Sequence, residues 1–129
     1  MKSRKSIVTK LDKEFSLYIR RRQSVNGTVK CFTCGKSDHW QNMDCGHFQS
    51  RKHYATRWDE KNCQVQCKGC NVFRYGEQFI FGENLDKVYG EGTAHQLLQE
   101  SRQVVKLNNN DLIEKIKYYQ EINATFKEF

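Results

Sequence analysis

Two Cys-x2-Cys pairs constrain the fold of this chain more than any other feature: CFTC at residues 31–34 and CKGC at residues 67–70. Each pair can present two thiolates from one tight turn, and four thiolates are a ligand set that a tetrahedral Zn²⁺ ion favours. A disulfide framework is the alternative, since six cysteines make an even count, but such frameworks belong to secreted chains. The pattern predicts one structural zinc site with four ligands, which are Cys31, Cys34, Cys67 and Cys70.

The two remaining cysteines, Cys45 and Cys63, stand alone in the sequence. Neither belongs to a Cys-x2-Cys pair, which argues against a role as a zinc ligand. We therefore expect two buried thiols that pack against each other. Membership of the metal site is the alternative for either one.

The length of 129 residues suits one domain, which a bound metal would stabilise materially. No run of apolar residues approaches the roughly 18 that a membrane span requires. The first ten residues, MKSRKSIVTK, are basic but lack the apolar core of a secretory signal. We therefore expect a cytoplasmic protein with reduced cysteines and no membrane partner.

Apolar residues recur at helical spacing in four stretches, which predicts helices over residues 6–22, 83–89, 93–106 and 111–126. Residues 29–76 lack this periodicity and are rich in Cys, Gly and His, as a small metal-organised β-rich core would be. The predicted fold is α+β in a single domain over residues 1–129. It has a basic N-terminal helix within 1–27, a zinc-bound core over 28–82 and C-terminal helices over 83–129.

The net charge of +7 is distributed unevenly along the chain. Residues 1–22 carry eight Lys or Arg against two acids, residues 30–74 carry eight against four, and residues 75–129 carry six against nine. A basic half is typical of a protein that binds a polyanion, because phosphate contacts release condensed counterions. A solvated surface is the alternative explanation of the same charges.

Three polar residues follow in the order His47, Asn62 and Asn71, and the last two frame the second cysteine pair in the stretch NCQVQCKGCN. This stretch resembles the end of the HNH nucleases of the ββα-metal superfamily, which runs Asn-x4-Cys-x2-Cys-His, with Asn71 in place of the final His. A wider set of motifs, LDKEFSLYIRRR, DCGHF, RWDEKNCQVQCKGCN and FIFGENLDKVYG, is similar to the phage NinG (Rap) recombination protein family over roughly residues 10–120. The resemblance implies a treble-clef, HNH-like ββα-metal core between flanking helices.

The resemblance also implies roles for these residues in phosphodiester hydrolysis. His47 would be the general base, because an imidazole can accept a proton from water near neutral pH. Asn62 would hold the loop of the hairpin that aims His47, and Asn71 would bind a catalytic Mg²⁺ or Mn²⁺ ion through its side-chain oxygen. Many relatives place a metal-binding side chain just before the base, where this chain has Gly46.

Asp44 is the nearest acid to that position. In a regular strand Asp44 and His47 point to opposite faces, so a bulge at Gly46 would be needed to bring the carboxylate to the ion. On that condition we expect Asp44 as a second ligand. His53 lies where a loop could reach the phosphate, and it is the other candidate for completing the metal site.

Six basic residues are candidates for contacts with DNA phosphates: Arg20, Arg21, Arg22, Arg51, Lys52 and Arg57. The first three close the N-terminal helix, where they would also complement the helix dipole. The other three lie in the connection of the predicted hairpin. A guanidinium group suits a phosphate because it can donate two parallel hydrogen bonds.

These features predict a metal-dependent DNA endonuclease. The NinG resemblance implies branched recombination DNA as its substrate, a Holliday junction or a D-loop, in the bacterial host cell of a phage or prophage. Because a junction is two-fold symmetric, a homodimer is a natural assembly. The alternative is a non-catalytic zinc-stabilised module that binds branched DNA without cutting it.

Overall fold

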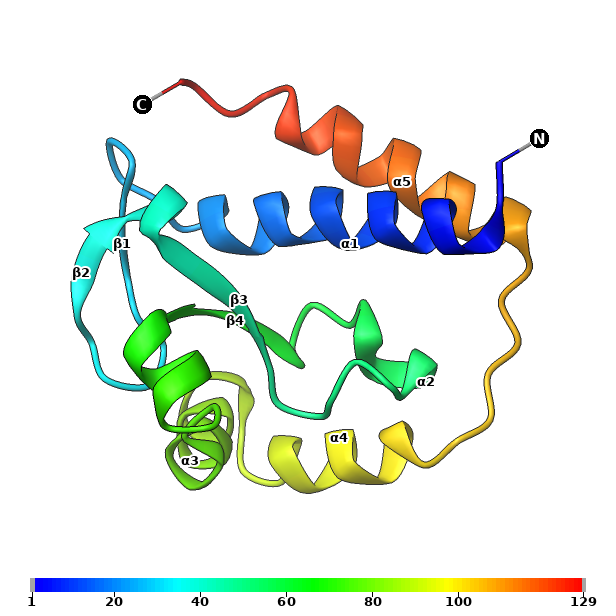
Figure 1. Cartoon of the computed structure of the whole chain (residues 1–129). Coiled ribbons are helices and arrows are strands. Elements are labelled where there is room, and N and C mark those ends of the chain that lie inside the picture. The colour runs from blue at the N-terminus through cyan, green and yellow to red at the C-terminus, as the bar shows by residue number, and fades with distance from the viewer. Residues whose placement is uncertain (1, 129) are drawn as a thin grey trace.

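The computed structural model describes residues 2–128, and Figure 1 shows their arrangement. The long helix α1 (Arg4–Arg21) is followed by two antiparallel two-stranded sheets, β1 (Thr28–Lys30) with β2 (Ser37–His39) and β3 (Met43–His47) with β4 (Cys63–Cys67). The other helical segments are η1 (Trp40–Asn42), α2 (Tyr54–Arg57), η2 (Gly69–Phe73), α3 (Gln78–Tyr89), α4 (Thr93–Ser101) and α5 (Asn109–Asn123). Within residues 2–128, no helix combines the length and apolar character needed to cross a membrane.

The α+β prediction is confirmed, and the four predicted helices are present with different ends. Helix α3 begins at Gln78 instead of residue 83, because the apolar run at residues 79–81 hides the helical period: only Phe81 of the three is buried. Helix α4 ends at Ser101 instead of residue 106, and α5 spans Asn109–Asn123 instead of 111–126. The structure adds three short helical segments, η1, α2 and η2, within residues 29–76, where the sequence shows no helical periodicity.

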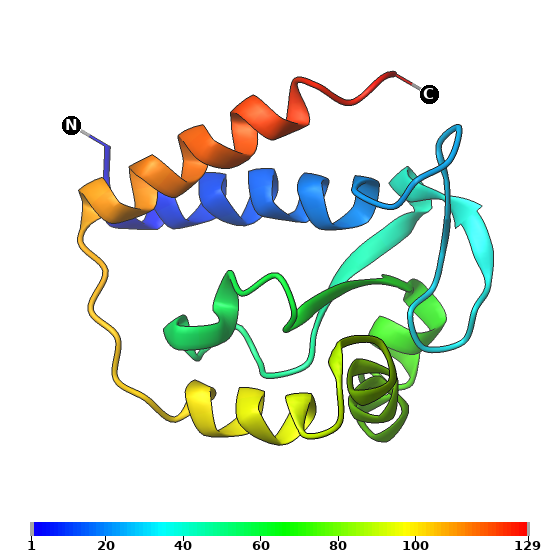
Figure 2. The same cartoon turned by 180° about the vertical axis from the view of Figure 1, so that it is seen from behind.

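Helices α1 and α5 lie side by side, and Figures 1 and 2 show this pair along one side of the molecule. Ser3 begins α1 by accepting a hydrogen bond from the Ser6 amide, which satisfies one of the free N–H groups of the first turn. The buried apolar residues of α1 recur every fourth residue, and they are Ile7, Leu11, Phe15 and Ile19. Helix α5 completes this cluster with Leu112, Ile116 and Tyr119.

The carboxylate of Glu60 joins the two helices to the loop before β4. Tyr18 of α1 donates a hydrogen bond to Glu60 Oε1 at 3.1 Å, and Tyr119 of α5 donates one to Oε2 at 2.9 Å. Burial, followed by the bond to Glu60, raises the pKa of the Tyr119 hydroxyl, so this group remains a proton donor at neutral pH. Two helices far apart in the sequence thus share one acceptor.

A second polar link joins α1 to the connection between β3 and β4. Asp12 of α1 accepts hydrogen bonds from the Arg57 guanidinium at 3.1 and 2.6 Å, and from the indole nitrogen of buried Trp58 at 2.9 Å. Arg57 ends α2, and α4 packs against α2 as well. The connection is therefore held between α1 and α4.

Two smaller apolar clusters surround the β3–β4 hairpin. One contains Val29, Met43 and Val65 beside the cysteine pairs. The other contains Phe81 and Leu85 of α3 with Leu97 of α4, and two partly buried phenylalanines, Phe32 and Phe48, pack against it. The second cluster fixes the start of α3 close to the hairpin.

Tyr119→Phe tests the shared acceptor, because it removes one hydroxyl and leaves the ring in place. We expect the free energy of unfolding to fall by about 1–2 kcal/mol, since the variant cannot make the hydrogen bond to a charged group. Tyr118→Phe is the matched control on the same helix, where the side chain is 55% exposed, and it should leave stability unchanged. Urea unfolding of the zinc-loaded protein measures both variants. Equal stabilities would contradict the role of Glu60 as a link.

Candidate metal centre and adjoining pocket

The two cysteine pairs come together next to one end of the β3–β4 hairpin. The first pair occupies the turn after β1, which is closed by a hydrogen bond from the Gly35 amide to the Cys31 carbonyl at 2.9 Å. Gly35 adopts a φ of +79° there, a conformation for which glycine meets no steric penalty. The second pair spans the end of β4 and η2, where the Cys70 amide donates to Sγ of Cys67 at 3.5 Å.

The four sulfur atoms lie within 4.8 Å of one another, and those of Cys34 and Cys67 are 3.6 Å apart. A tetrahedral ion with Zn–S bonds of about 2.3 Å separates its sulfurs by about 3.8 Å, whereas a disulfide bond measures about 2 Å. All six cysteines of the chain carry free thiols. The prediction that the two pairs form one cluster is confirmed, and this cluster could hold a zinc ion.

The thiols of this cluster differ in acidity. Although burial opposes ionisation of Cys31, hydrogen bonds from Thr33 and from backbone amides lower its pKa to about 6. Burial raises the pKa of Cys70 to about 12. Cys70 therefore holds its proton in metal-free protein at neutral pH, so zinc binding must release it.

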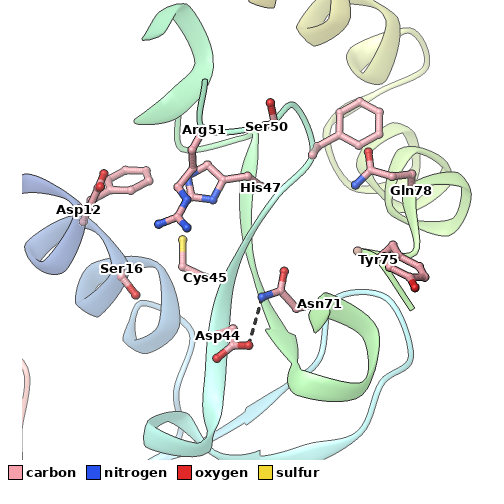
Figure 3. Close-up of a pocket in the computed structure, with 13 residues that line it drawn as sticks. Asp12, Ser16, Asp44, Cys45, His47, Ser50, Arg51, Asn71, Tyr75 and Gln78 are labelled. Carbon is pink, nitrogen blue, oxygen red and sulfur yellow. Dashed lines mark hydrogen bonds between the residues drawn. The ribbon is translucent and has the colours of Figure 1, made fainter. Parts of the chain in front are cut away.

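A pocket of about 600 Å³ adjoins the cluster, because Asn71, which follows Cys70 directly, forms part of its wall (Figure 3). The other walls come from α1, β3, the loop after β3 and the segment before α3. The lining includes Asp44 and His47, which the sequence had singled out together with Asn71, and it includes Arg51. The structure thus brings four of the predicted site residues into one pocket.

A backbone carbonyl sets the orientation of His47. Its Nε2 lies 2.9 Å from the carbonyl oxygen of Arg57. Since a carbonyl only accepts hydrogen bonds, Nε2 carries the proton and Nδ1 keeps its lone pair. Burial lowers the pKa of His47, the Arg57 carbonyl partly offsets that effect, and the positive charge of Arg51 lowers the pKa further. At neutral pH the imidazole is uncharged and can accept a proton at Nδ1.

Asn62 is fully buried and ties the connection between β3 and β4 together. Its side-chain oxygen accepts a hydrogen bond from the Gln49 amide at 2.8 Å, and its side-chain nitrogen donates to the carbonyls of Gln49 and Thr56, both at 3.0 Å. This connection leads from His47 to the Arg57 carbonyl that orients it. Asn62 therefore stabilises the frame around His47, and its part in catalysis stays a prediction.

Asp44 and Asn71 lie next to each other in the pocket, as the dashed line in Figure 3 shows. Asn71 Nδ2 donates to Asp44 Oδ2 at 3.1 Å, and Lys68 Nζ lies 2.7 Å from Asp44 Oδ1. A carboxylate with an amide oxygen is a hard ligand pair that suits Mg²⁺ or Mn²⁺, which take water and substrate oxygens in their other positions. Rotation of the Asn71 amide would present its oxygen, and the Lys68 side chain is 61% exposed and free to move into solvent. With those two changes, Asp44 and Asn71 could hold a divalent ion.

Gly46 does not form the bulge on which the expectation for Asp44 depended. Strand β3 pairs with β4 without interruption from Met43 opposite Cys67 to His47 opposite Cys63. Asp44 reaches Asn71 from this regular strand, and the pocket is lined by Asp44 and His47 nonetheless.

Glycine is required at position 46 for a steric reason. A Cβ at this position would collide with the side-chain oxygen of Gln66, which is fully buried. Gln66 is held in place because its side-chain nitrogen donates to Thr33 Oγ1 at 3.1 Å and to the Gly76 carbonyl at 3.0 Å. No sequence pattern indicated Gln66, since its importance depends on a contact between paired strands.

Cys45 and Cys63 lie apart from the four-cysteine cluster. Their sulfurs and a ring nitrogen of His47 are within 4.8 Å of one another. Cys63 is fully buried, its Sγ lies 3.5 Å from the Arg57 carbonyl oxygen, and burial raises its pKa well above the ordinary value. The predicted contact between these two thiols is confirmed, with Cys63 buried and Cys45 half-buried.

The six basic candidates differ in what their side chains contact. Arg21, Arg22 and Arg57 direct their guanidinium groups to partners inside the molecule, which are the carbonyls of Lys127, Glu60 and Cys63 and the carboxylate of Asp12. Arg20 is half-buried and lies over the Trp40 ring. Arg51 and Lys52 are exposed, so their charges are accessible from the solvent. His53 immediately precedes α2 and is not part of the pocket wall.

The fold and site define an α+β protein with a cysteine cluster suited to zinc and an adjoining polar pocket. The family model described as Bacteriophage Lambda NinG protein matches residues 1–128. The chain belongs to the NinG family, so the resemblance to that family is confirmed. No curated protein and no solved structure matches the chain.

Zinc affinity should rise with pH, because the raised pKa values of Cys34 and Cys70 mean that both thiols hold protons that zinc must displace. Competition with a chelator at about pH 6 and pH 8 measures this dependence. Cys67→Ser should lose zinc and unfold the core, while Cys45→Ser, outside the cluster, should keep one zinc per chain. Full zinc retention by Cys67→Ser would contradict the four-ligand assignment.

Proposed function

We propose that this chain is a metal-dependent DNA endonuclease of the HNH-like ββα-metal type, with the cysteine cluster as its treble-clef scaffold. The observation that best supports the proposal is one pocket that combines a neutral imidazole, His47, with a hard-ligand pair, Asp44 and Asn71. Phosphodiester hydrolysis needs a base for the attacking water and positive charge near the phosphate. In this proposal His47 would be the base, and an ion held by Asp44 and Asn71 would supply the charge.

His47 would take the proton from the attacking water at Nδ1, while its Nε2–H remains bonded to the Arg57 carbonyl. That carbonyl would also stabilise the imidazolium that forms. Asp44 and Asn71 would hold the Mg²⁺ or Mn²⁺ ion, whose charge polarises the phosphate and stabilises the leaving oxygen. Arg51, exposed in the pocket wall, would bind a phosphate oxygen.

Branched recombination DNA is the substrate class that we propose. The NinG family is associated with phage recombination. The basic charge of residues 1–74 suits a phosphate-rich ligand and carries no sequence information, which fits recognition of DNA shape. A homodimer would place two such pockets on a two-fold symmetric junction.

A non-catalytic module that binds branched DNA is the second candidate, and one observation favours it. Asp44 already has a partner for each of its oxygens, Asn71 and Lys68, so the polar groups are satisfied without an ion. In that case the pocket would bind a DNA phosphate through its basic residues and leave the backbone intact.

His47→Ala separates the two candidates. If His47 is the general base, cleavage of a four-way junction with Mg²⁺ or Mn²⁺ should fall by on the order of 10² to 10⁴. Zinc content and DNA affinity should stay at wild-type values. Asn71→Ala should instead raise the metal concentration needed for half-maximal activity. His95→Ala, on the exposed face of α4, is the matched control and should cut normally.

The pH dependence of kcat/KM distinguishes a base from a structural histidine. The active form is the neutral imidazole, so activity is lost as pH falls through the pKa of His47. Because burial lowers that pKa below 6.5, activity should stay level down to about pH 6.5 and decline only at lower pH. Wild-type protein that binds junctions but cuts none with either metal would decide for the non-catalytic module. Unchanged cleavage by His47→Ala would remove His47 from the mechanism.

Arg51→Ala/Lys52→Ala tests the binding of DNA phosphates. DNA affinity should fall, and the slope of log affinity against log salt concentration should become shallower by roughly one unit for each phosphate that the variant no longer binds. Arg102→Ala/Lys106→Ala removes the same charge from exposed positions after α4 and is the matched control. Equal salt slopes for the two double variants would place the DNA elsewhere on the surface.

A further inference from the structure

The segment from η2 to the first turn of α3 exposes aromatic side chains at high density. Phe73 is 78% exposed, Tyr75 is 88% exposed and Phe79 is 80% exposed. Their neighbours Val72 and Ile80 are exposed as well. Single exposed apolar residues are normal on a protein surface, but five large ones within residues 72–80 make this segment a candidate binding surface.

The backbone of this segment is held rigidly in the conformation that exposes the rings. Tyr75 and Glu77 adopt left-handed φ angles of 54° and 49°, a strain that persists only where the surroundings impose it. Gly76, between them, donates to the Cys70 carbonyl at 2.7 Å and accepts a hydrogen bond from buried Gln66 at 3.0 Å. Hydrogen bonds to Cys70 and to Gln66 of β4 therefore fix the backbone of the segment. The rings are exposed because the fold holds the backbone in this conformation.

Tyr75 stands in the wall of the pocket that contains His47. Figure 3 shows Tyr75 and Gln78 on one side of the pocket and Arg51 on the other. An aromatic face opposite a guanidinium group matches the two parts of a nucleotide, a flat base and a charged phosphate.

We propose that Phe73, Tyr75 and Phe79 form an aromatic platform that stacks on unpaired or unstacked bases at a DNA branch point. This inference rests on the proposed function, because it requires that DNA occupies the His47 pocket. Bases inside a continuous duplex are stacked on one another and offer no free face, whereas a base at a branch can turn onto a protein ring. The platform would therefore favour branched DNA over linear duplex without reading sequence.

The charges around the platform favour DNA over an apolar protein partner. Lys68 and Arg74 are exposed and close in sequence to the rings, and Arg51 is exposed in the opposite wall of the pocket. Glu77, half-buried, is the one acid among residues 72–80. The core of a protein–protein interface is depleted of charge, whereas a surface for single-stranded nucleic acid combines cations with stacking rings.

The experiment measures DNA binding by the zinc-loaded full chain in a His47→Ala background, so that no DNA is cut. Phe73→Ala, Tyr75→Ala and Phe79→Ala are compared with Tyr118→Ala, which removes an exposed tyrosine from α5. The probes are a four-way junction with 2-aminopurine at the branch point and a linear duplex of equal length.

Each platform variant should bind the junction roughly tenfold more weakly, which is about the effect of losing one stacked base, and should bind the duplex as before. Tyr75→Trp should keep the junction affinity and Tyr75→Leu should lose it, because stacking requires an aromatic face. Binding should quench the 2-aminopurine fluorescence, and Tyr75→Ala should abolish that quenching.

An equal loss of affinity for both DNAs, or full junction affinity in Tyr75→Leu, would overturn the proposal. So would platform variants that change a dimer into a monomer in sedimentation and leave junction binding intact. Failure of the nuclease proposal would look different. If the wild-type chain cuts no DNA but the platform variants still lose their preference for the junction, the nuclease proposal fails and the platform proposal stands. If the wild-type chain cuts junctions and the platform variants bind them as tightly as before, the nuclease proposal stands and the platform proposal fails.

Discussion

The clustering of four cysteine sulfur atoms, from Cys31, Cys34, Cys67 and Cys70, is the constraint on which the rest of the structure depends. One ion bound to all four would close a loop over the 32 residues between Cys34 and Cys67. Asp44 and His47 lie inside that loop, and Asn71 comes just after the last cysteine. In sites of this size the free energy of zinc binding is also free energy of folding. A metal that never touches DNA would thus determine whether the proposed catalytic pocket forms.

Arg57 connects the β3–β4 hairpin to helix α1 through both its side chain and its backbone. Its guanidinium is bound to Asp12, while its backbone carbonyl orients His47. Asn62 holds the same connection from within by bonding to the Thr56 carbonyl, one residue earlier. The backbone that orients the imidazole is therefore fixed by Asp12 through the Arg57 side chain and by Asn62 at Thr56. A change in the packing of α1 would reach the imidazole through Arg57.

The cysteine cluster and the helical core could be predicted because both follow from short-range patterns. A Cys-x2-Cys turn presents two thiols whatever surrounds it, and a four-residue apolar repeat marks one face of α1. The role of Arg22 could not be predicted, since the carbonyls that it binds lie 38 and 41 residues away in the sequence. Gly46 was misread for the same reason: the residue that excludes a side chain there, Gln66, approaches from the neighbouring strand. The start of α3 was missed where exposed aromatic residues interrupt the apolar repeat, which is the kind of local inconsistency expected at a functional surface.

The pairing of α1 with α5 has a consequence for the order in which the chain folds. Arg4 bonds to Asn109 and Glu14 to Asn123, across sequence separations of 105 and 109 residues. Contacts between such distant residues form late, because a long loop must close before they contribute. During translation α1 leaves the ribosome well before α5 exists, with its apolar face uncovered. The cysteine cluster needs only residues 31–70, so folding during synthesis would begin in the middle of the chain and finish when the two outer helices meet.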